Sequence, residues 1–573
     1  ITILASLFTA LTLVPMLCSR LLGGGRQDNR NNGQSYFSHP LRHLYALSEK
    51  WFNRVEDRYK LLLRWALSHR KTIIIGGIII LLSSIAFIPL IGTEFMPQQD
   101  KGRIEITLEF PEGTRMEETG KFTRAVQDIL AKNVPENLTY FAVWGYGGTG
   151  ISTMMGGREG SNIGRVSARL VPKDQRERSD LKISNVLRPM LSSFPGARIR
   201  FSTEDPMSRL MFGGTKPLVI EIKGYDLDVG INLARQVAGM LKDIKGVTDV
   251  DISMKEGKPE LQIIVDREKA SNLGLNVSNI ANTVRACVDG IEATEYRELG
   301  DEYKVWVRLR EEDRSNLTDI ESIFITSPTG KQVRLSNVAR IKRDIGPVKI
   351  ERDTQERIIK VTADLFERDL GSVVAECNEK LAGLVIPQGF SIDFGGAREE
   401  QIKSFRFLFL ALILGVILVY MVMASQFESL RSPFIIIFSV PFAMIGVICA
   451  LALTGHTLSV VSFIGLIMLV GIVVNNAIVL VDYTNILRAR GLSVQEAVQT
   501  GGRDRLRPIL MTATTTIFGL LPLALSTGEG SEAWNAMGVA VIGGLIVSTL
   551  ITLIFVPTLY SILEDWREKG TKL

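Results

Sequence analysis

The chain has 573 residues, of which 46% are hydrophobic and 22% are charged, and its formal net charge is +5. A basic surplus could indicate a nucleic-acid partner, but these basic residues gather in short loops between apolar stretches. That placement excludes nucleic-acid binding as the reason for the charge and is typical of a membrane protein with basic cytoplasmic loops.

Seven apolar stretches are long enough, or nearly so, to cross a bilayer as helices, since a hydrocarbon core of about 30 Å needs about 20 apolar residues. A soluble block, residues 93–404, lies between the second and third. The sequence therefore predicts an α-helical polytopic membrane protein with seven spans and a large α+β exported domain. The stretches are Ile1–Leu17, Thr72–Ile91, Phe405–Met423, Phe434–Thr454, Leu458–Tyr483, Ile509–Leu525 and Met537–Leu559.

The distribution of Lys and Arg predicts the orientation of these spans. Basic residues are dense between the first two spans, from Arg20 to Lys71, and in the loop expected after the fifth span, from Arg488 to Arg507. Short loops of this kind stay cytoplasmic. Residues 93–404 are therefore expected on the outer, periplasmic side of a cytoplasmic (inner) membrane.

The start of the chain is unusual for a membrane protein. It begins at Ile1, inside an apolar helix, with no basic flank and no cleavage-site pattern, so a signal peptide is not expected. We expect a fragment or the second half of a split protein. Further along, Tyr36–His69 carries apolar side chains at helical spacing beside basic ones. This pattern predicts a helix on the cytoplasmic face of the bilayer, with a solvated connector as the alternative.

The exported block has the pattern of two α/β units of one kind. Strand–helix–strand occurs twice in each, which is the ferredoxin-like, split βαβ order. The second unit is interrupted by an insertion, Met254–Asp344, with helices of its own. The expected elements are Arg103–Phe110, Arg115–Ala131, Leu138–Trp144, Ile163–Val171, Asp180–Leu191 and Ala197–Phe201, then Pro217–Lys223, Leu227–Lys242, Val247–Ser253, Arg357–Asp364, Leu370–Ala382 and Phe390–Phe394, with Arg267–Leu273 and Val277–Val288 in the insertion.

Signals for catalysis or a bound metal are weak. No cysteine or histidine cluster has zinc spacing, and we expect neither an enzyme nor a cofactor. Met207 and Met211 could form a soft-metal site, although surface or core methionine is the plainer interpretation. Cys287 and Cys377 are both exported and could pair, but their spacing alone does not support a disulfide.

Five motifs occur in order along the chain: Gly92-Thr-Glu-Phe-Met-Pro97, Asp266-Arg-Glu-Lys-Ala-Ser-Asn-Leu-Gly274, Ala424-Ser-Gln-Phe-Glu-Ser429 with Pro433, Gly471-Ile-Val-Val-Asn-Asn-Ala-Ile-Val-Leu-Val-Asp482, and Arg505-Leu-Arg-Pro-Ile-Leu-Met-Thr512. Together they resemble the resistance–nodulation–division (RND) efflux transporters, in the hydrophobe/amphiphile (multidrug) branch. The resemblance covers essentially the whole chain. It implies the last helix of the family's first half followed by the complete C-terminal half.

The resemblance also implies how the chain is divided. The expected parts are a membrane helix (1–22), a cytoplasmic linker with a surface helix (23–71), a membrane helix (72–92), a porter subdomain (93–205), a second porter subdomain (206–253 and 345–400), a docking subdomain (254–344), a five-helix membrane bundle (401–565) and a cytoplasmic tail (566–573).

Two asparagines, Asn475 and Asn476, lie in mid-span, where polar residues are costly. They could simply join helices by hydrogen bonds. The resemblance implies a proton relay instead, because family members couple export to protons through an aspartate pair in the first half that faces a lysine, an arginine and a threonine in the second. Arg505 and Thr512 match the last two. Asn475 stands at the lysine position, which leaves one cation fewer to hold the carboxylates ionised.

The stretch Gly145–Gly157 is dense in glycine, which permits conformations that other residues avoid, so we expect it to be mobile. A phosphate-binding loop is the alternative, but no Gly-Lys-Ser/Thr follows. In the family this position matches the switch loop beside the drug pocket. By this resemblance the substrate-binding residues are Phe141, Val143, Tyr146, Met154, Met155 and Phe201.

The resemblance implies proton-driven export of hydrophobic and amphiphilic compounds, with this chain as the second half of the transporter. The implied partners are the missing N-terminal half, two further copies in a homotrimer, a periplasmic adaptor, an outer-membrane channel and small amphiphilic substrates. Two alternatives stay open: an RND-type exporter of lipids, metal ions or proteins, and a membrane module that transports nothing.

Overall fold

The computed structural model describes residues 39–145, 160–191, 196–202, 216–254, 258–328, 330–346 and 350–570, together with Phe8, Thr12 and Met16. The chain divides into two compact units, residues 1–65 and 66–573. The first unit contains most of helix α3 (His39–Ser68), where an amphipathic surface helix was expected. The predicted span Ile1–Leu17 lies outside the described residues except for three of its positions.

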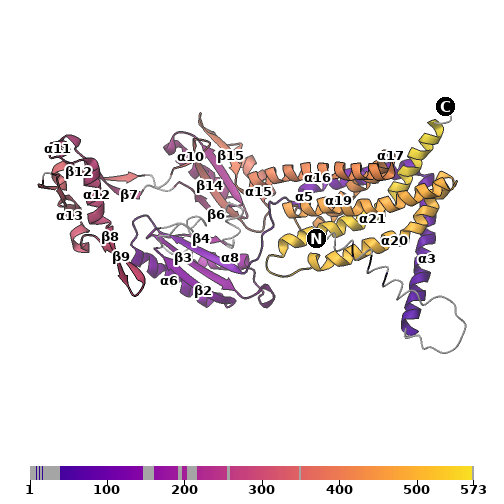
Figure 1. Ribbon diagram of the computed structural model, residues 1–573, viewed down its shortest axis with the longest axis horizontal. Helices are drawn as coiled ribbons and strands as arrows, with labels where there is room; N and C mark the ends of the chain where they lie inside the picture. Colours follow the sequence, from indigo (N-terminus) through magenta and orange to yellow (C-terminus); the bar gives the residue numbers. More distant parts are fainter. Residues whose placement is uncertain are drawn as a thin grey trace. The chain divides into compact units, whose positions relative to one another are not determined.

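The first α/β unit is a four-stranded antiparallel sheet with two helices packed on one face (Figure 1). Its strand order, β2-β3-β1-β4, together with the chain order β-α-β-β-α-β, is that of the split βαβ plan. Ile104, Ile106 and Leu108 of the central strand are fully buried beneath both helices. The elements are β1 (Arg103–Glu109), α6 (Met116–Asn133), β2 (Asn137–Trp144), β3 (Ile163–Leu170), α8 (Asp180–Leu191) and β4 (Arg198–Ser202), with a 3₁₀ turn at Lys173–Gln175.

The second α/β unit repeats this order with its strands separated in sequence by the insertion. The main sheet path is β13-β14-β5-β15, and β6 also pairs with β14. Asp226 and Asp369 begin the two helices by accepting hydrogen bonds from backbone N–H groups of the first turn, as N-cap residues do. The elements are β5 (Leu218–Lys223), α10 (Leu227–Lys242), β6 (Val247–Ile252), β13 (Glu351–Asp353), β14 (Glu356–Leu365), α15 (Leu370–Leu381) and β15 (Ser391–Gly395).

The insertion leaves and re-enters the second unit through one antiparallel pair, β7 with β12, in which Val265 faces Ala339. Beyond this pair it has a small core around Ile280, Ile325 and Leu335. The elements are β7 (Lys258–Val265), α11 (Arg267–Asn272), α12 (Val277–Val288), β8 (Ile291–Glu298), β9 (Asp301–Val307), α13 (Leu317–Glu321), β10 (Phe324–Thr326), β11 (Gln332–Arg334), α14 (Leu335–Val338) and β12 (Ala339–Gly346), with a 3₁₀ turn at Glu311–Arg314.

The possible disulfide is not formed, because Cys287 on α12 and Cys377 on α15 are both free thiols. Cys377 belongs to the core of the second unit, whereas Cys287 packs against the core of the insertion. Burial raises the pKa of Cys377 to about 11, so this thiol stays protonated and unreactive at neutral pH.

Five helical segments in the described part of the chain are long and apolar enough to cross a membrane, and a sixth is counted only if α3 and the helix after it form one bent span. Of the seven predicted stretches, Ile1–Leu17 lies almost entirely outside the described residues. The remaining elements are α4 (Arg70–Ala86), α5 (Ile88–Ile91), α16 (Ala397–Phe427), α17 (Arg431–Ile437), α18 (Ser439–Thr454), α19 (Val460–Ala489), α20 (Val494–Ala524) and α21 (Glu532–Gly570).

Helix α21 packs closely against α18 through small residues. A Cβ atom placed on Gly543 would lie 2.1 Å from the Cβ of Ala450, and one on Gly446 would lie 2.3 Å from the Gly543 carbonyl oxygen. Neither position has room for a side chain. Close approach at small residues is how helices gain packing energy in a bilayer, where the hydrophobic effect between helices is absent.

The basic segment after the fifth predicted span is not a loop, and here the sequence-based prediction was wrong. Arg503, Arg505 and Arg507 all lie within α20. The helix starts early because Ser493 and Glu496 form a reciprocal capping box at its first turn. The helix then continues through Pro508, the residue that precedes the predicted span Ile509–Leu525.

Two aspartates are buried next to each other where the first α/β unit begins. Asp100 is 8% exposed and forms an ion pair with the buried guanidinium of Arg176, whereas Asp180 is fully buried. The oxygens of Asp180 accept hydrogen bonds from the backbone N–H groups of Lys101 and Leu181. Burial, together with the charge of Asp100, raises the pKa of Asp180 to about 8. The Arg176 guanidinium pairs with Asp100, and the neighbouring Asp180 holds a proton at neutral pH.

The proton on Asp180 should be visible in the pH dependence of stability. An aspartate ionises near pH 4 in an unfolded chain. Between about pH 4 and pH 8 the folded state therefore binds one extra proton, and this carboxyl's contribution to the free energy of unfolding falls as the pH rises. Asp180→Asn cannot ionise, so its thermal midpoint should fall less than that of the wild type between about pH 6 and pH 9.

The exposed Asp174→Asn is the matched control and should keep the wild-type pH dependence. Infrared spectra of the wild type at about pH 6 should contain a protonated-carboxyl band that disappears near pH 8 and is missing in Asp180→Asn. An identical pH dependence in all three proteins would contradict the assignment.

Candidate functional site

Polar side chains interrupt the apolar surface of α19 halfway along its length. Asn476 is 7% exposed and points into the bundle, whereas the neighbouring Asn475 lies on the exposed surface. No hydrogen bond joins the Asn475 side chain to a described residue. The two asparagines thus occupy different environments, and Asn476 alone is packed among the helices of this chain.

Helix α20 brings Thr512 to Asn476. The Thr512 hydroxyl lies 3.2 Å from Asn476 Oδ1 and 3.0 Å from the Ile509 carbonyl oxygen. The structure therefore joins two of the predicted relay residues by a direct hydrogen bond between α19 and α20. Thr512 is itself exposed, although its hydroxyl reaches α19.

Arg505 lies two helical turns before Thr512 and contacts an aromatic ring of α19. Its guanidinium carbon is 4.4 Å from the ring centre of Tyr483, a cation–π contact. The Tyr483 hydroxyl in turn lies 3.1 Å from Asp504 Oδ2. Arg505 Nε is buried and has no hydrogen-bond partner among the described residues. A buried donor without an acceptor lowers stability, so an acceptor outside the described residues would stabilise this group.

The structure does not bring all the predicted relay residues into mutual contact. Asn476 and Thr512 bond, Arg505 stacks on Tyr483, and Asn475 joins neither group within the described chain. What Asn475 and Thr512 share is exposure on neighbouring helices of one bundle. Asn475 and Arg505 Nε, which have no acceptor among the described residues, supply hydrogen-bond donors that suit carboxylate oxygens.

The predicted substrate residues separate into three groups. Phe141 and Val143 lie on the edge strand β2, 50% and 36% exposed, so they are available for contact and are not core residues. Phe201 is 5% exposed, belongs to the core of the first unit and lies beneath the Arg188 guanidinium, so its ring is buried in this structure. Tyr146, Met154 and Met155 lie outside the described residues.

Sequence reasoning missed the chemistry of Glu94, although it singled out the motif that contains it. Burial raises the pKa of Glu94 to about 7, a hydrogen bond with Thr457 opposes the rise, and the nearby charge of Asp369 adds to it. Its backbone N–H bonds the Leu458 carbonyl oxygen at 3.1 Å. The motif was visible in the sequence, but its burial against a loop more than 360 residues away was not.

A second missed feature is the hairpin of β8 and β9. Every residue of both strands is exposed, including Tyr296 and Tyr303, which face each other across the hairpin at 55% exposure each. At its tip Leu299 is fully exposed and has a φ of 51°, a conformation that few residues other than glycine adopt. An isolated two-stranded hairpin is marginally stable at best, so this one needs a covering surface.

Comparison with known proteins gives a consistent family. The AcrB/AcrD/AcrF family matches residues 1–564. The swarming motility protein SwrC of Bacillus subtilis (strain 168) is 31% identical over 99% of this chain and 51% of its own length. The cobalt-zinc-cadmium resistance protein CzcA of Cupriavidus metallidurans is 29% identical over 90% of this chain and 50% of its own length.

Among solved structures, a crystal structure of a heavy metal efflux pump superposes with a TM-score of 0.74 at 27% identity, over 89% of this chain and 52% of that one. The chain thus spans about half the length of the relatives it matches. A match that extends over nearly every residue, with the fold and motif order described above, shows that the chain belongs to the AcrB/AcrD/AcrF family of RND transporters.

Proposed function

We propose that this chain is the C-terminal half of a proton-driven exporter of hydrophobic and amphiphilic compounds in the cytoplasmic membrane. The observation that carries the proposal is the buried Arg505 Nε, which has no acceptor among the described residues, on the bundle that also exposes Asn475 and Thr512. Polar groups at membrane depth face partners or water, because exposure to lipid is costly. The proposed partner is an acidic pair from the N-terminal half.

In this proposal Arg505 holds the partner carboxylates ionised, because a nearby positive charge lowers a carboxyl pKa. Asn475 donates a hydrogen bond to the same oxygens. The Thr512 hydroxyl, which donates to Asn476 Oδ1 in this structure, exchanges that acceptor for a carboxylate oxygen of the partner. Protonation of the carboxyl pair removes its attraction to Arg505. The equilibrium between two packings of α19 and α20 then shifts, which couples proton binding to conformation.

Arg505→Ala, in the protein completed by co-expression of the first half, should abolish export while leaving the amount of protein in the membrane unchanged. Thr512→Ala removes one neutral hydrogen bond of about 1 kcal/mol and should reduce export about fivefold. Arg490→Ala removes an exposed arginine beyond the end of α19 and is the matched control. Efflux of a fluorescent cationic dye from energised cells measures all three, and normal efflux by Arg505→Ala would contradict the relay.

Asn475 should influence the pH dependence of transport. Asn475→Lys places a cation beside the partner carboxylates and lowers their pKa, so the pH optimum of export should move to lower pH. Asn475→Ala removes a donor and should reduce export at every pH. Proton-coupled dye transport in proteoliposomes over a pH series measures both. If wild type and both variants share one pH profile, Asn475 serves helix packing alone.

The proposal of hydrophobic and amphiphilic substrates is based on the apolar edge strand of the first α/β unit, where Phe141 and Val143 are exposed. Apolar and aromatic walls bind amphiphilic molecules with little directional demand. A second candidate substrate is a metal ion, which the likeness to CzcA and to a heavy metal efflux pump favours. Accumulation of dyes and of zinc, cobalt and cadmium in cells that express wild type or Arg505→Ala distinguishes the two classes.

We further propose that the β8–β9 hairpin inserts into a neighbouring copy in a homotrimer, because its residues are exposed on both faces. Leu299→Asp places a charge at the tip and should convert trimers to monomers, whereas Leu299→Met keeps an apolar tip and should assemble normally. Native mass spectrometry of the completed protein in detergent measures the copy number. Trimers of undiminished abundance in Leu299→Asp would exclude this role for the hairpin.

A further inference from the structure

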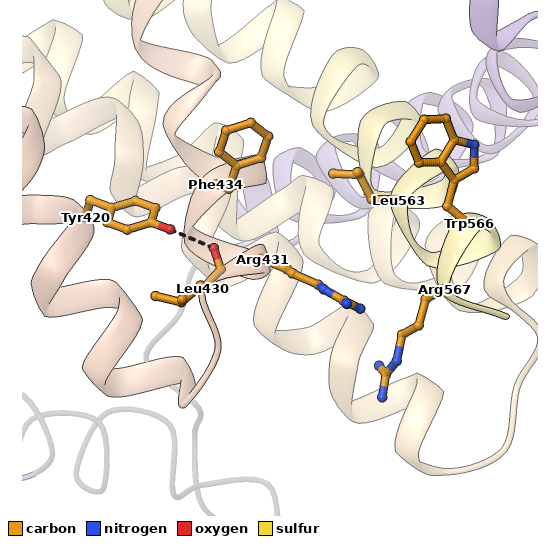
Figure 2. A pocket seen from close by; sticks show the side chains of 7 residues that line it. All are labelled: Tyr420, Leu430, Arg431, Phe434, Leu563, Trp566 and Arg567. Atoms are coloured by element: carbon orange, nitrogen blue, oxygen red, sulfur yellow. Dashed lines mark hydrogen bonds between the residues drawn. The ribbon is translucent and has the colours of Figure 1, made fainter. Parts of the chain in front are cut away.

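A pocket of about 620 Å³ opens where three membrane helices come together at one end of the bundle. Figure 2 shows Tyr420 of α16 on one side of it, with its hydroxyl 2.9 Å from the Leu430 carbonyl oxygen. This bond joins the end of α16 to the turn that leads into α17. The C-terminal part of α21 closes the opposite side. The excess of basic residues at this end of the bundle assigns it to the cytoplasmic side.

The pocket has two arginines and no carboxylate among its lining residues. Arg431 extends from the start of α17 toward α21, and Arg567 extends from α21 on the same side of the pocket (Figure 2). Within the described chain no acidic side chain pairs with Arg431. Arg567 forms an ion pair with Glu564, 3.6 Å away, which does not line the pocket. The pocket is therefore positively charged.

The rest of the pocket wall is apolar and open to the surroundings of the bundle. Phe434, Leu563 and Trp566 lie together beside the arginines (Figure 2). Phe434 is 48% exposed and Trp566 is 73% exposed. Large apolar rings next to cations are the pattern of a membrane interface, where aromatic side chains lie at headgroup level.

We propose that this pocket binds the headgroup of an anionic phospholipid from the cytoplasmic leaflet. The guanidinium groups of Arg431 and Arg567 bind the phosphate, and an acyl chain lies along Phe434, Leu563 and Trp566. Guanidinium is suited to this role because its planar array of N–H donors matches phosphate oxygens. The proposal requires only that α16, α17 together with α18, and α21 span the membrane, and it is independent of substrate and coupling ion.

A membrane lipid fits the pocket better than a soluble phosphate. A free anion would use the two arginines but leave Phe434 and Trp566 in contact with water. A phospholipid covers these rings and neutralises the arginines at the same time. Basic pockets between membrane helices on the cytoplasmic side are known to favour anionic headgroups for this reason.

The experiment uses the full chain, stripped of lipid in detergent, with Trp566 as the reporter. Phosphatidylglycerol with brominated acyl chains should quench the emission that Trp566→Phe removes, and brominated phosphatidylcholine should quench it far less. Arg431→Ala should weaken the phosphatidylglycerol effect about fivefold, the loss expected for one arginine near an anionic lipid. Arg431→Lys keeps the charge but not the planar donor array, so it should fall in between.

Arg490→Ala, which removes one exposed arginine elsewhere, should bind phosphatidylglycerol like the wild type. Thermal midpoints of all variants should agree, which shows that Arg431→Ala is folded. Equal quenching by the two lipids, or equal weakening in Arg431→Ala and Arg490→Ala, would overturn the proposal. Competition by inorganic phosphate alone would identify a soluble-anion site instead. Loss of lipid quenching once the first half is co-expressed would show that protein covers the pocket.

Discussion

The need to compensate charge within an apolar surrounding is the constraint on which this structure depends. Arg505 is held by the ring of Tyr483, yet its buried Nε has no acceptor within the described chain. A buried donor without an acceptor is costly. The contact region of α19 and α20 therefore carries a polar group that the described chain does not compensate, whereas α18 and α21 are closely packed through glycine.

Backbone hydrogen bonds connect α19 and α21 directly to the segment that leads into the first α/β unit. The first residue of α19, Val460, donates its backbone N–H to the Phe95 carbonyl oxygen, and Thr93 pairs with Leu458 just before it. The turn before α21 is held similarly, because the Gly530 N–H bonds the Asp100 carbonyl oxygen. Backbone hydrogen bonds are short and directional. A displacement of α19 or α21 must therefore move the segment that leads into the first α/β unit, or break these bonds.

The sequence was sufficient to predict most elements, because strands and helices in the α/β units follow local periodicity. The helices over Asp180–Leu191, Leu227–Lys242 and Val277–Val288 have the predicted bounds to the residue. The prediction failed where two local signals competed. A run of arginines before Pro508 resembles a basic loop, but the capping box at Ser493 starts a helix that continues through both. The capping box therefore determined where the helix begins, although the basic composition of the segment is typical of a loop.

The site was less predictable, because ionisation depends on contacts between distant segments. Burial beside Asp100 raises the pKa of Asp180, and burial near the loop that precedes α19 raises the pKa of Glu94. Neither environment leaves a periodic signal in the chain. Both carboxyl groups lie where an α/β unit meets the membrane helices, and both have pKa values near neutrality. The backbone contacts that would transmit a movement of α19 or α21 therefore lie next to carboxyl groups that titrate near neutral pH. A change of proton occupancy at Asp180 or Glu94 would change the charge at these same contacts.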